Sequence, residues 1–271
     1  MTDGAAIRVG IGGWTYEPWR DNFYPAKWPH KRELEYASRQ LTAIEINGTF
    51  YSTFKPESWA KWRDTVPEDF VFAVKGSRFC VNRKVLGTAG EAVAKFVGQG
   101  LVELGDKLGP ILWQLAATKR FDPEDIRAFL ALLPREHGGV RLRHALQPRH
   151  ESFGCPEFVT LAREAGAAIA FADSPTYPAI ADVTAPFVYA RLERGDEANL
   201  HCYPDADLDR WADAARTWAA GGRPAGLPYV GNELVATVPR ETFMFLINGG
   251  KPRAPAGAQA LLSRLSGPSR R

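Results

Sequence analysis

Short apolar runs of strand-forming residues recur along the chain, and each is followed by a stretch whose apolar residues have helical spacing. The runs begin near Ile7, Ala43, Phe70, Pro110, Leu142, Ala167, Phe187 and Thr242. Because parallel neighbours need long crossover connections, this alternation is typical of parallel βαβ units. The predicted fold class is therefore α/β, as a single (β/α)8 barrel of the TIM type, with a doubly wound open sheet as the alternative.

The helical stretches between these strands open at proline, acidic or hydroxyl residues and close at glycine or proline. They are expected at Pro56–Asp64, Ala89–Leu108, Pro123–Leu133, Pro156–Ala165 and Asp205–Ala220. No linker or composition break divides the 271 residues, so one barrel domain is expected over residues 1–265 and a flexible tail over 266–271. The segment Pro204–Gly231 is rich in Ala, Gly and Pro, and an irregular barrel is expected there.

Composition is that of a globular protein, with 45% hydrophobic and 24% charged residues. The cysteines Cys80, Cys155 and Cys202 are odd in number and far apart, which favours free thiols in a reducing cytoplasm. The first residues lack a secretion signal, and no apolar run approaches the roughly 18 residues that span a bilayer. A cytoplasmic protein without a membrane partner is expected, and the net charge of +3 alone indicates no partner.

Alternation along each strand orients its polar residues, because helices pack against the apolar outer face of a barrel. In the second strand Ile44 and Ile46 share one face, so Glu45 and Asn47 are predicted to face the lumen. In the last strand Phe243, Phe245 and Ile247 are expected to face the helices and Met244, Leu246 and Asn248 the lumen. The other strands end in the polar residues Lys75, Gln114, Gln147, Asp173 and Arg191. Barrel enzymes carry their active sites at these carboxyl ends.

Basic residues follow three of the strands and are expected to surround the same end of the barrel. They are Lys75, Arg78, Arg83 and Lys84 after the third strand, Arg149 and His150 after the fifth, and Lys251 and Arg253 after the eighth. Such a cluster predicts an anion site. The alternative is that these cations pair with Glu45, Asp173 and Glu151 and only hold the loops. The aromatic residues Trp14, Tyr16, Trp19, Phe23, Tyr24, Phe50 and Tyr51 lie in the neighbouring loops, where they either stack on a ligand or close the barrel mouth.

Several stretches carry a resemblance to a known family. They read GGWTYEPWRDNFYP, IEINGTFYS, PESWAKWRDTVPEDFVFAVKGSRF, LGDKLGPILWQL, RHALQPRHESF, FADSP, DVTAPFVYARL and FLINGGKPRAP. In this order, from about Ile7 to Leu265, the chain resembles the YecE-like family, domain of unknown function 72. The resemblance implies a (β/α)8 barrel and brings no known reaction.

One position departs from the pattern of that family. The fifth strand of the family usually ends in a glutamate followed by a short apolar residue and Arg-His, whereas this chain has Gln147, Pro148, Arg149 and His150. A glutamine does not take up a proton or bind a metal usefully at neutral pH. If the usual glutamate is a catalytic base, this chain relies on Glu45 or Asp173 or has lost the chemistry.

The leading hypothesis is an enzyme-like site that binds a phosphorylated or nucleic-acid-derived anion, with a phosphate-ester hydrolase as the first reaction to consider. Glu45 and Asp173 are the candidate catalytic residues. The candidate ligand-binding residues are Asn47, Lys75, Arg78, Gln114, Gln147, Arg149, His150, Arg191, Asn248 and Lys251. The alternatives are a non-catalytic binding or scaffold barrel and a metal-dependent sugar isomerase or epimerase. No cofactor is predicted, and a divalent metal is disfavoured because the chain has only five histidines and few carboxylates near the strand ends.

Overall fold

The computed structural model describes residues 5–231 and 236–267. Its main sheet is parallel, with the strand order β8-β7-β4-β3-β2-β1-β11-β10-β9. The strands are β1 (Ile7–Gly12), β2 (Ala43–Ile46), β3 (Val71–Lys75), β4 (Leu108–Gln114), β7 (His144–Gln147), β8 (Ala168–Ile169), β9 (Phe171–Asp173), β10 (Phe187–Leu192) and β11 (Glu241–Leu246). A short hairpin of β5 (Glu136–His137) and β6 (Val140–Arg141) lies outside this sheet.

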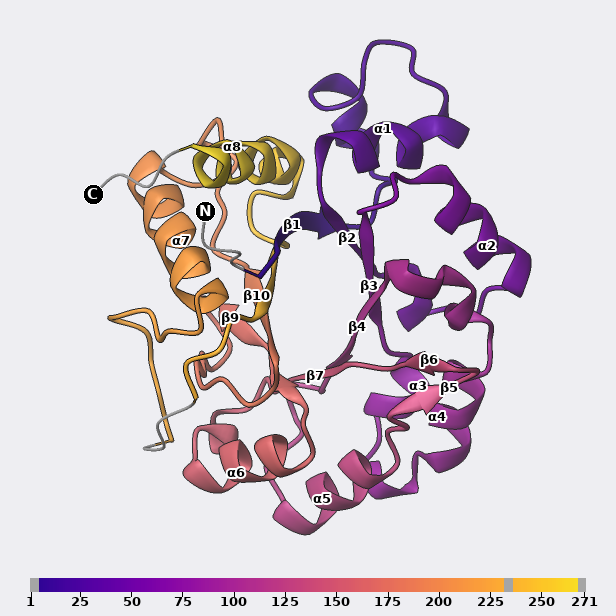
Figure 1. Cartoon of the computed structure of the whole chain (residues 1–271), viewed down its shortest axis with the longest axis vertical. Helices are drawn as coiled ribbons and strands as arrows, with labels where there is room; N and C mark the ends of the chain where they lie inside the picture. The colour runs from indigo at the N-terminus through magenta and orange to yellow at the C-terminus, as the bar shows by residue number, and fades with distance from the viewer. Residues whose placement is uncertain (1–4, 232–235, 268–271) are drawn as a thin grey trace.

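The two ends of the sheet meet because β8 and β9 are consecutive pieces of one strand. β8 pairs with β7 and β9 pairs with β10. Between them, Ala170 donates its N–H to the carbonyl of Leu146 at 2.8 Å. The strands therefore surround a central axis with helices outside them (Figure 1), and the predicted α/β barrel of the TIM type is confirmed.

The outer layer consists of α1 (Glu33–Gln40), α2 (Pro56–Thr65), α3 (Arg78–Val81), α4 (Gly90–Val97), α5 (Pro123–Ala131), α6 (Pro156–Glu164), α7 (Asp205–Ala219) and α8 (Ala254–Ser266). Proline opens α2, α5 and α6, as expected, where its missing N–H costs no helical bond. The helix expected over 89–108 instead ends after α4. Gly100, in a left-handed conformation with φ 107°, begins a separate 3-10 segment, Leu101–Lys107.

The boundary before the expected tail differs from the sequence expectation. α8 extends to Ser266, so the first residue of the expected tail is helical, while residues 268–271 lie outside the described residues. After α7, the segment to Gly231 adds no strand, in line with the irregular last third, and its end binds Asp182 through the N–H groups of Val230 and Gly231. No helix within the described ranges is long and apolar enough to cross a membrane.

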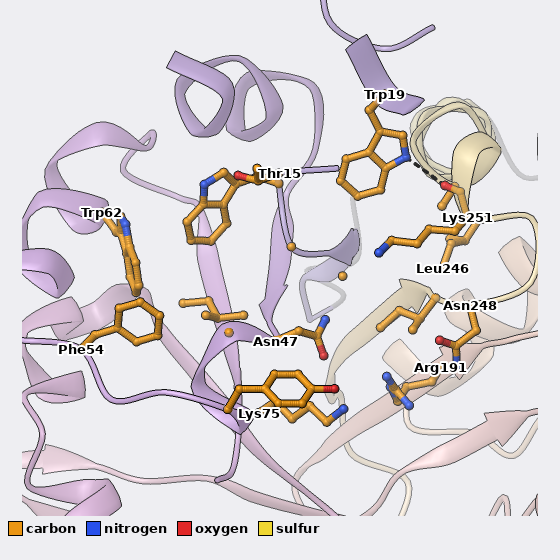
Figure 2. A pocket seen from close by; sticks show the side chains of 18 of the residues that line it. Thr15, Trp19, Asn47, Phe54, Trp62, Lys75, Arg191, Leu246, Asn248 and Lys251 are labelled. Atoms are coloured by element: carbon orange, nitrogen blue, oxygen red, sulfur yellow. Dashed lines mark hydrogen bonds between the residues drawn. The ribbon is translucent and has the colours of Figure 1, made fainter. Parts of the chain in front are cut away.

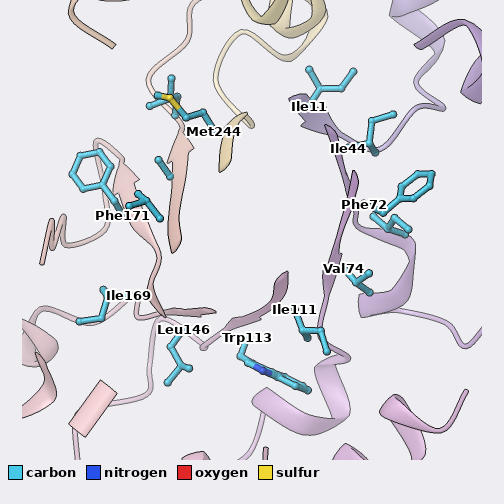
Figure 3. Packing of buried hydrophobic residues seen from close by; sticks show 14 of the residues in the cluster. Ile11, Ile44, Phe72, Val74, Ile111, Trp113, Leu146, Ile169, Phe171 and Met244 are labelled. Atoms are coloured by element: carbon cyan, nitrogen blue, oxygen red, sulfur yellow. The ribbon is translucent and has the colours of Figure 1, made fainter. Parts of the chain in front are cut away.

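The outer faces of the strands pack against the helices, as alternation predicts for most of the barrel. Ile44, Phe72 and Val74 point away from the lumen toward the helical layer (Figure 3). On the opposite face, Ala73 and Leu112 belong to a second apolar cluster inside the barrel.

The prediction for β11 is inverted. Phe243 and Phe245 lie inside the barrel, and Met244 and Leu246 face the helices. The neighbouring strand explains the reversal, since β1 presents the glycine Gly10 to the lumen beside Phe245. A position without a side chain leaves space that the large aromatic rings fill.

The aromatic rings inside the barrel stack on one another and carry a cation at the amino-terminal end. Phe245 lies 5.2 Å from the ring of Tyr189, and Phe243 lies 6.4 Å from it. The guanidinium of Arg143 sits 5.2 Å from Phe243 and pairs with Glu241. This end of the lumen is therefore filled.

A buried histidine joins β4 to β7. The indole Nε1 of Trp113 donates to Nδ1 of His144 at 3.1 Å, and Nε2 of His144 lies 2.8 Å from the carbonyl of Pro134. The ring is therefore neutral, with its proton on Nε2. Burial is the main cause that lowers the pKa of His144 below 6.5, and the hydrogen bond to Pro134 opposes it.

This arrangement predicts a loss of stability in mild acid. Below its ordinary pKa of 6.5 the unfolded histidine gains a proton that the folded ring resists, so the free energy of unfolding falls from pH 6.5 down to the lowered folded value. The melting temperature of the wild type should decline more steeply between pH 7 and about pH 5 than that of His144→Gln. Parallel pH profiles of the two proteins would contradict the assignment.

Candidate functional site

A cavity of about 500 Å³ opens at the carboxyl ends of the strands (Figure 2). Its cations are Lys75, Arg149, Arg191 and Lys251, its amides are Asn47 and Asn248, and its larger aromatic residues are Trp14, Trp19, Tyr51, Phe54 and Trp62. Among the described residues no aspartate or glutamate lines it. The cavity is therefore positively charged with partly aromatic walls.

Three of these cations rest on aromatic rings. The Nζ of Lys75 lies 4.5 Å from the centre of Phe50, the guanidinium of Arg149 lies 4.4 Å from Tyr177, and the Nζ of Lys251 lies 4.1 Å from Tyr16. Ring faces attract cations and hold their stems in place without neutralising the charge.

The alternative hypothesis was that the loop cations pair with Glu45, Asp173 and Glu151, and the cations that line the cavity in these loops do not. In residues 5–231 and 236–267, Lys75, Arg149 and Lys251 form no ion pair. The Nε of Arg149 is buried and has no hydrogen-bond partner in the same part of the chain. Burial lowers the pKa of Lys75 to about 8; Glu45 opposes this, and Arg191 and Arg149 add to it.

The fourth cation, Arg191, is held from below. Its Nε donates to Oε2 of Glu45 and its Nη2 to Oε1 of Glu45, each at 3.1 Å, and Tyr189 donates its hydroxyl to Oε2 of Glu45 at 2.7 Å. Nη1 of Arg191 donates to Glu193 at 2.6 Å. Arg191 and Glu45 are almost fully buried. Both oxygens of Glu45 are therefore occupied, and Glu45 orients Arg191 beneath the cavity.

Gln147 completes this network as an amide bridge. Its Oε1 accepts Nη1 of Arg191 and Nε2 of Gln114, each at 2.7 Å, and its Nε2 donates to Glu193 at 3.1 Å. A glutamate at this position, as the family resemblance leads one to expect, has no proton to donate to Glu193 at neutral pH. The amide of Gln147 therefore suits the neighbouring carboxylate of Glu193, to which it donates a hydrogen bond.

Six predicted site residues lie outside the cavity lining. Glu45, Gln114 and Gln147 belong to the network around Arg191, and the other three lie elsewhere. Asp173 follows Phe171 on the helix-facing side and pairs with Arg194 at 3.0 Å, while Tyr203 lies 3.4 Å from its other oxygen. Arg78 is exposed in α3 against the ring of Phe79. His150 accepts the N–H of Ser152 at 3.1 Å and caps a turn. Asp173 therefore lies on the helix-facing side of its strand, whereas Glu45 faces the lumen and binds Arg191.

Asn248 reaches the cavity although the alternation of β11 is inverted. Its backbone is left-handed, with φ 65°, which breaks the alternation just after the strand. Asn47 and Lys75 line the cavity as predicted, and Gln114, Gln147 and Arg191 meet beside it.

Sequence reasoning missed Glu193 and Tyr189. The signal was present, because Tyr189, Arg191 and Glu193 are spaced by two and share the lumen side of β10. Glu193 was overlooked because it stands one residue beyond the end of the strand.

The donors at the cavity do not fit a catalytic metal. Amides, ammonium groups and guanidinium groups line it, and the nearest carboxylates are bound to Arg191. Throughout the described part of the chain, no group of three or more His, Cys, Asp or Glu side chains is arranged to hold a metal ion.

Comparison with known proteins identifies related sequences and structures. Residues 8–270 match the family described as "Protein of unknown function DUF72". Over 142 residues the chain is 29% identical to UPF0759 protein YecE of Escherichia coli K12, covering 51% of this chain and 48% of that protein. The matched stretch thus spans about half the length of this curated relative.

Two crystal structures of DUF72 family proteins share the fold over nearly the whole chain. The protein from Thermotoga maritima has a TM-score of 0.67 at 19% identity and covers 95% of this chain and 97% of its own. The protein from Enterococcus faecalis has a TM-score of 0.69 at 17% identity and covers 96% of this chain and 97% of its own.

The amide bridge at Gln147 gives a testable prediction. Gln147→Glu places a carboxylate against Glu193, so one of the two must hold a proton in the folded state, and the destabilisation grows as the pH rises from about 5 to 8. We expect a loss of about 2 kcal/mol at pH 8 by denaturant unfolding. The double variant Gln147→Glu with Glu193→Gln exchanges the two groups and should recover most of it. Equal stability of Gln147→Glu and the wild type at pH 8 would refute the bridge.

Proposed function

The chain belongs to the DUF72 family, a family of unknown function, and we propose that its barrel mouth binds a small phosphorylated molecule. The observation that carries this proposal is the unneutralised charge of the cavity. Lys75, Arg149 and Lys251 line one space and are held by rings rather than by carboxylates. Burial of the Lys75 and Arg149 charges is costly unless an anion compensates them, and the exposed Lys251 adds a third positive charge at the mouth.

The buried Nε of Arg149 supports the same conclusion. Buried donors are nearly always hydrogen-bonded, and this one has no partner among the residues that the structure describes. A phosphate oxygen is a suitable acceptor, because guanidinium groups bind phosphate through directed N–H bonds.

The size and walls of the cavity favour a small ligand that also has a ring or other apolar part. A volume of about 500 Å³ is typical of sites for small molecules. Trp14 and Trp62, whose rings are 5.2 Å apart, contribute an aromatic wall. The amides of Asn47 and Asn248 are available to hydroxyl or carbonyl groups of the ligand. The three free thiols are compatible with the reducing cytoplasm that we propose as its compartment.

Hydrolysis of a phosphate ester has less support. A general base for water needs a free lone pair that faces the substrate, whereas Glu45 is occupied by Arg191 and Tyr189. Asp173 is paired with Arg194 outside the cavity lining.

A binding barrel without turnover is the second candidate. The amide at Gln147 favours it, because this residue stands where the family usually has an ionisable group and serves here as a bridge. Turnover of any phosphorylated substrate by the natural chain would eliminate this candidate.

Calorimetric titration tests the proposed binding, with inorganic phosphate, pyrophosphate, sugar phosphates, nucleotides and a short oligonucleotide as separate ligands. At least one phosphorylated small molecule should bind, and affinity should fall with added salt. Lys75→Met and Arg149→Gln should each weaken binding by about tenfold to a hundredfold, since a charged hydrogen bond contributes about 1.5–3 kcal/mol.

Lys84→Met is the matched control, because Lys84 is an exposed lysine outside the cavity lining. It should bind like the wild type. No binding of any ligand at millimolar concentration, or equal weakening in all three variants, would overturn the proposal. Binding of the oligonucleotide alone would replace the small molecule by a nucleic acid.

A further inference from the structure

We propose that Lys75 is an amine nucleophile that forms a Schiff base with a phosphorylated aldehyde or ketone bound in the cavity. The inference rests on the proposed function, because the phosphate group is what brings the carbonyl carbon to this residue. Lys75 ends β3, and its side chain extends along the floor of the cavity with its amine toward Arg191 (Figure 2).

The backbone at Lys75 is fixed on both sides. The hydroxyl of Thr49 donates to the carbonyl of Lys75 at 2.6 Å. The next residue, Gly76, donates its N–H to Leu112 at 2.8 Å, and a Cβ at Gly76 would lie 2.4 Å from the ring of Trp113. A nucleophile on a rigid strand end is positioned before the substrate arrives, which is the arrangement that favours reaction.

The surroundings of the amine favour its neutral, reactive form. Burial and the cations Arg191 and Arg149 lower the pKa of Lys75 to about 8, while Glu45 and Glu193 oppose the shift. Both of those carboxylates are bound to Arg191. An amine with this lowered pKa is neutral at pH 7.5 far more often than an ordinary lysine with a pKa of 10.5. Desolvation beside other cations is a known way to activate lysine for carbonyl chemistry.

The second lysine of the cavity is suited to a different task. Lys251 is exposed, lies in the loop after β11 and rests on the rings of Tyr16 and Trp19. With Arg149 it is placed to contact the phosphate group, while Lys75 attracts the anion in its charged form and reacts with the carbonyl carbon in its neutral form.

Iminium formation at Lys75 consumes one proton and releases one water molecule. The nitrogen lone pair of neutral Lys75 forms a bond to the carbonyl carbon, and the carbonyl π electrons move to oxygen, which takes up the proton that the attached nitrogen gives up. The resulting hydroxyl leaves as water after a second protonation while the nitrogen lone pair forms the C=N bond. The nitrogen retains one hydrogen and carries the positive charge, so amine, carbonyl compound and one proton give iminium and water.

Reductive trapping tests this step in the full-length protein. The probes are glyceraldehyde 3-phosphate and dihydroxyacetone phosphate, each with cyanoborohydride, which delivers hydride to the imine carbon and leaves a stable secondary amine. Peptide mapping should locate the adduct at Lys75 with at least about tenfold higher yield than at the exposed Lys55 of the same molecule. Unphosphorylated glyceraldehyde should label Lys75 far less.

Two variants separate this inference from the proposed function. Lys75→Arg keeps the positive charge but cannot form the imine, so it should lose the adduct. Calorimetry of the natural chain with inorganic phosphate tests the anion site separately. The control Lys84→Arg should label like the wild type. If phosphate binds but Lys75 carries no adduct, or if Lys251 is labelled instead, the Schiff base is wrong and the anion site stands. If phosphate does not bind at all, both are wrong.

Discussion

The site depends on the buried guanidinium of Arg191, which is held between Glu45 and Glu193. Removing one partner from such a group leaves an uncompensated charge and costs about 3–5 kcal/mol. The arrangement occupies Glu45, which the sequence analysis considers for chemistry, together with Glu193. It also links β2 to β10 across the lumen and, through Gln147, extends to β7. The strand ends around the cavity are thereby tied to one another below its floor.

Because these carboxylates are occupied below, the cations above them are left without acidic partners. Phe50, Tyr177 and Tyr16 hold Lys75, Arg149 and Lys251 instead. An aromatic face orients a cation and excludes water from its stem, while the charge remains available to a ligand. The aromatic residues that surround the barrel mouth therefore serve the electrostatics of the site as well as its packing.

Periodicity in the sequence was sufficient for the barrel and for part of the site. In β2 and β3 the outer residues are large and apolar and the inner ones polar or small, so Glu45 and Lys75 were oriented correctly. β11 is apolar on both faces, and only the glycine of the neighbouring β1 explains why Phe245 faces inward. Asp173 is a polar strand end that does not face the lumen, because it lies two residues after Phe171 and shares its helix-facing side. No local sequence pattern predicts which aromatic ring a cation will contact, because the two residues are far apart in the chain, as Arg149 and Tyr177 are.

The central claim is that the cavity holds a desolvated lysine with no acidic partner of its own, ready for an anion. An NMR titration of the Lys75 side chain, followed at Cε with and without inorganic phosphate, tests it most directly. The account predicts a pKa of about 8 in the free protein and a higher pKa with phosphate, because the anion stabilises the charged amine. A pKa near 10.5 that phosphate does not change would contradict it.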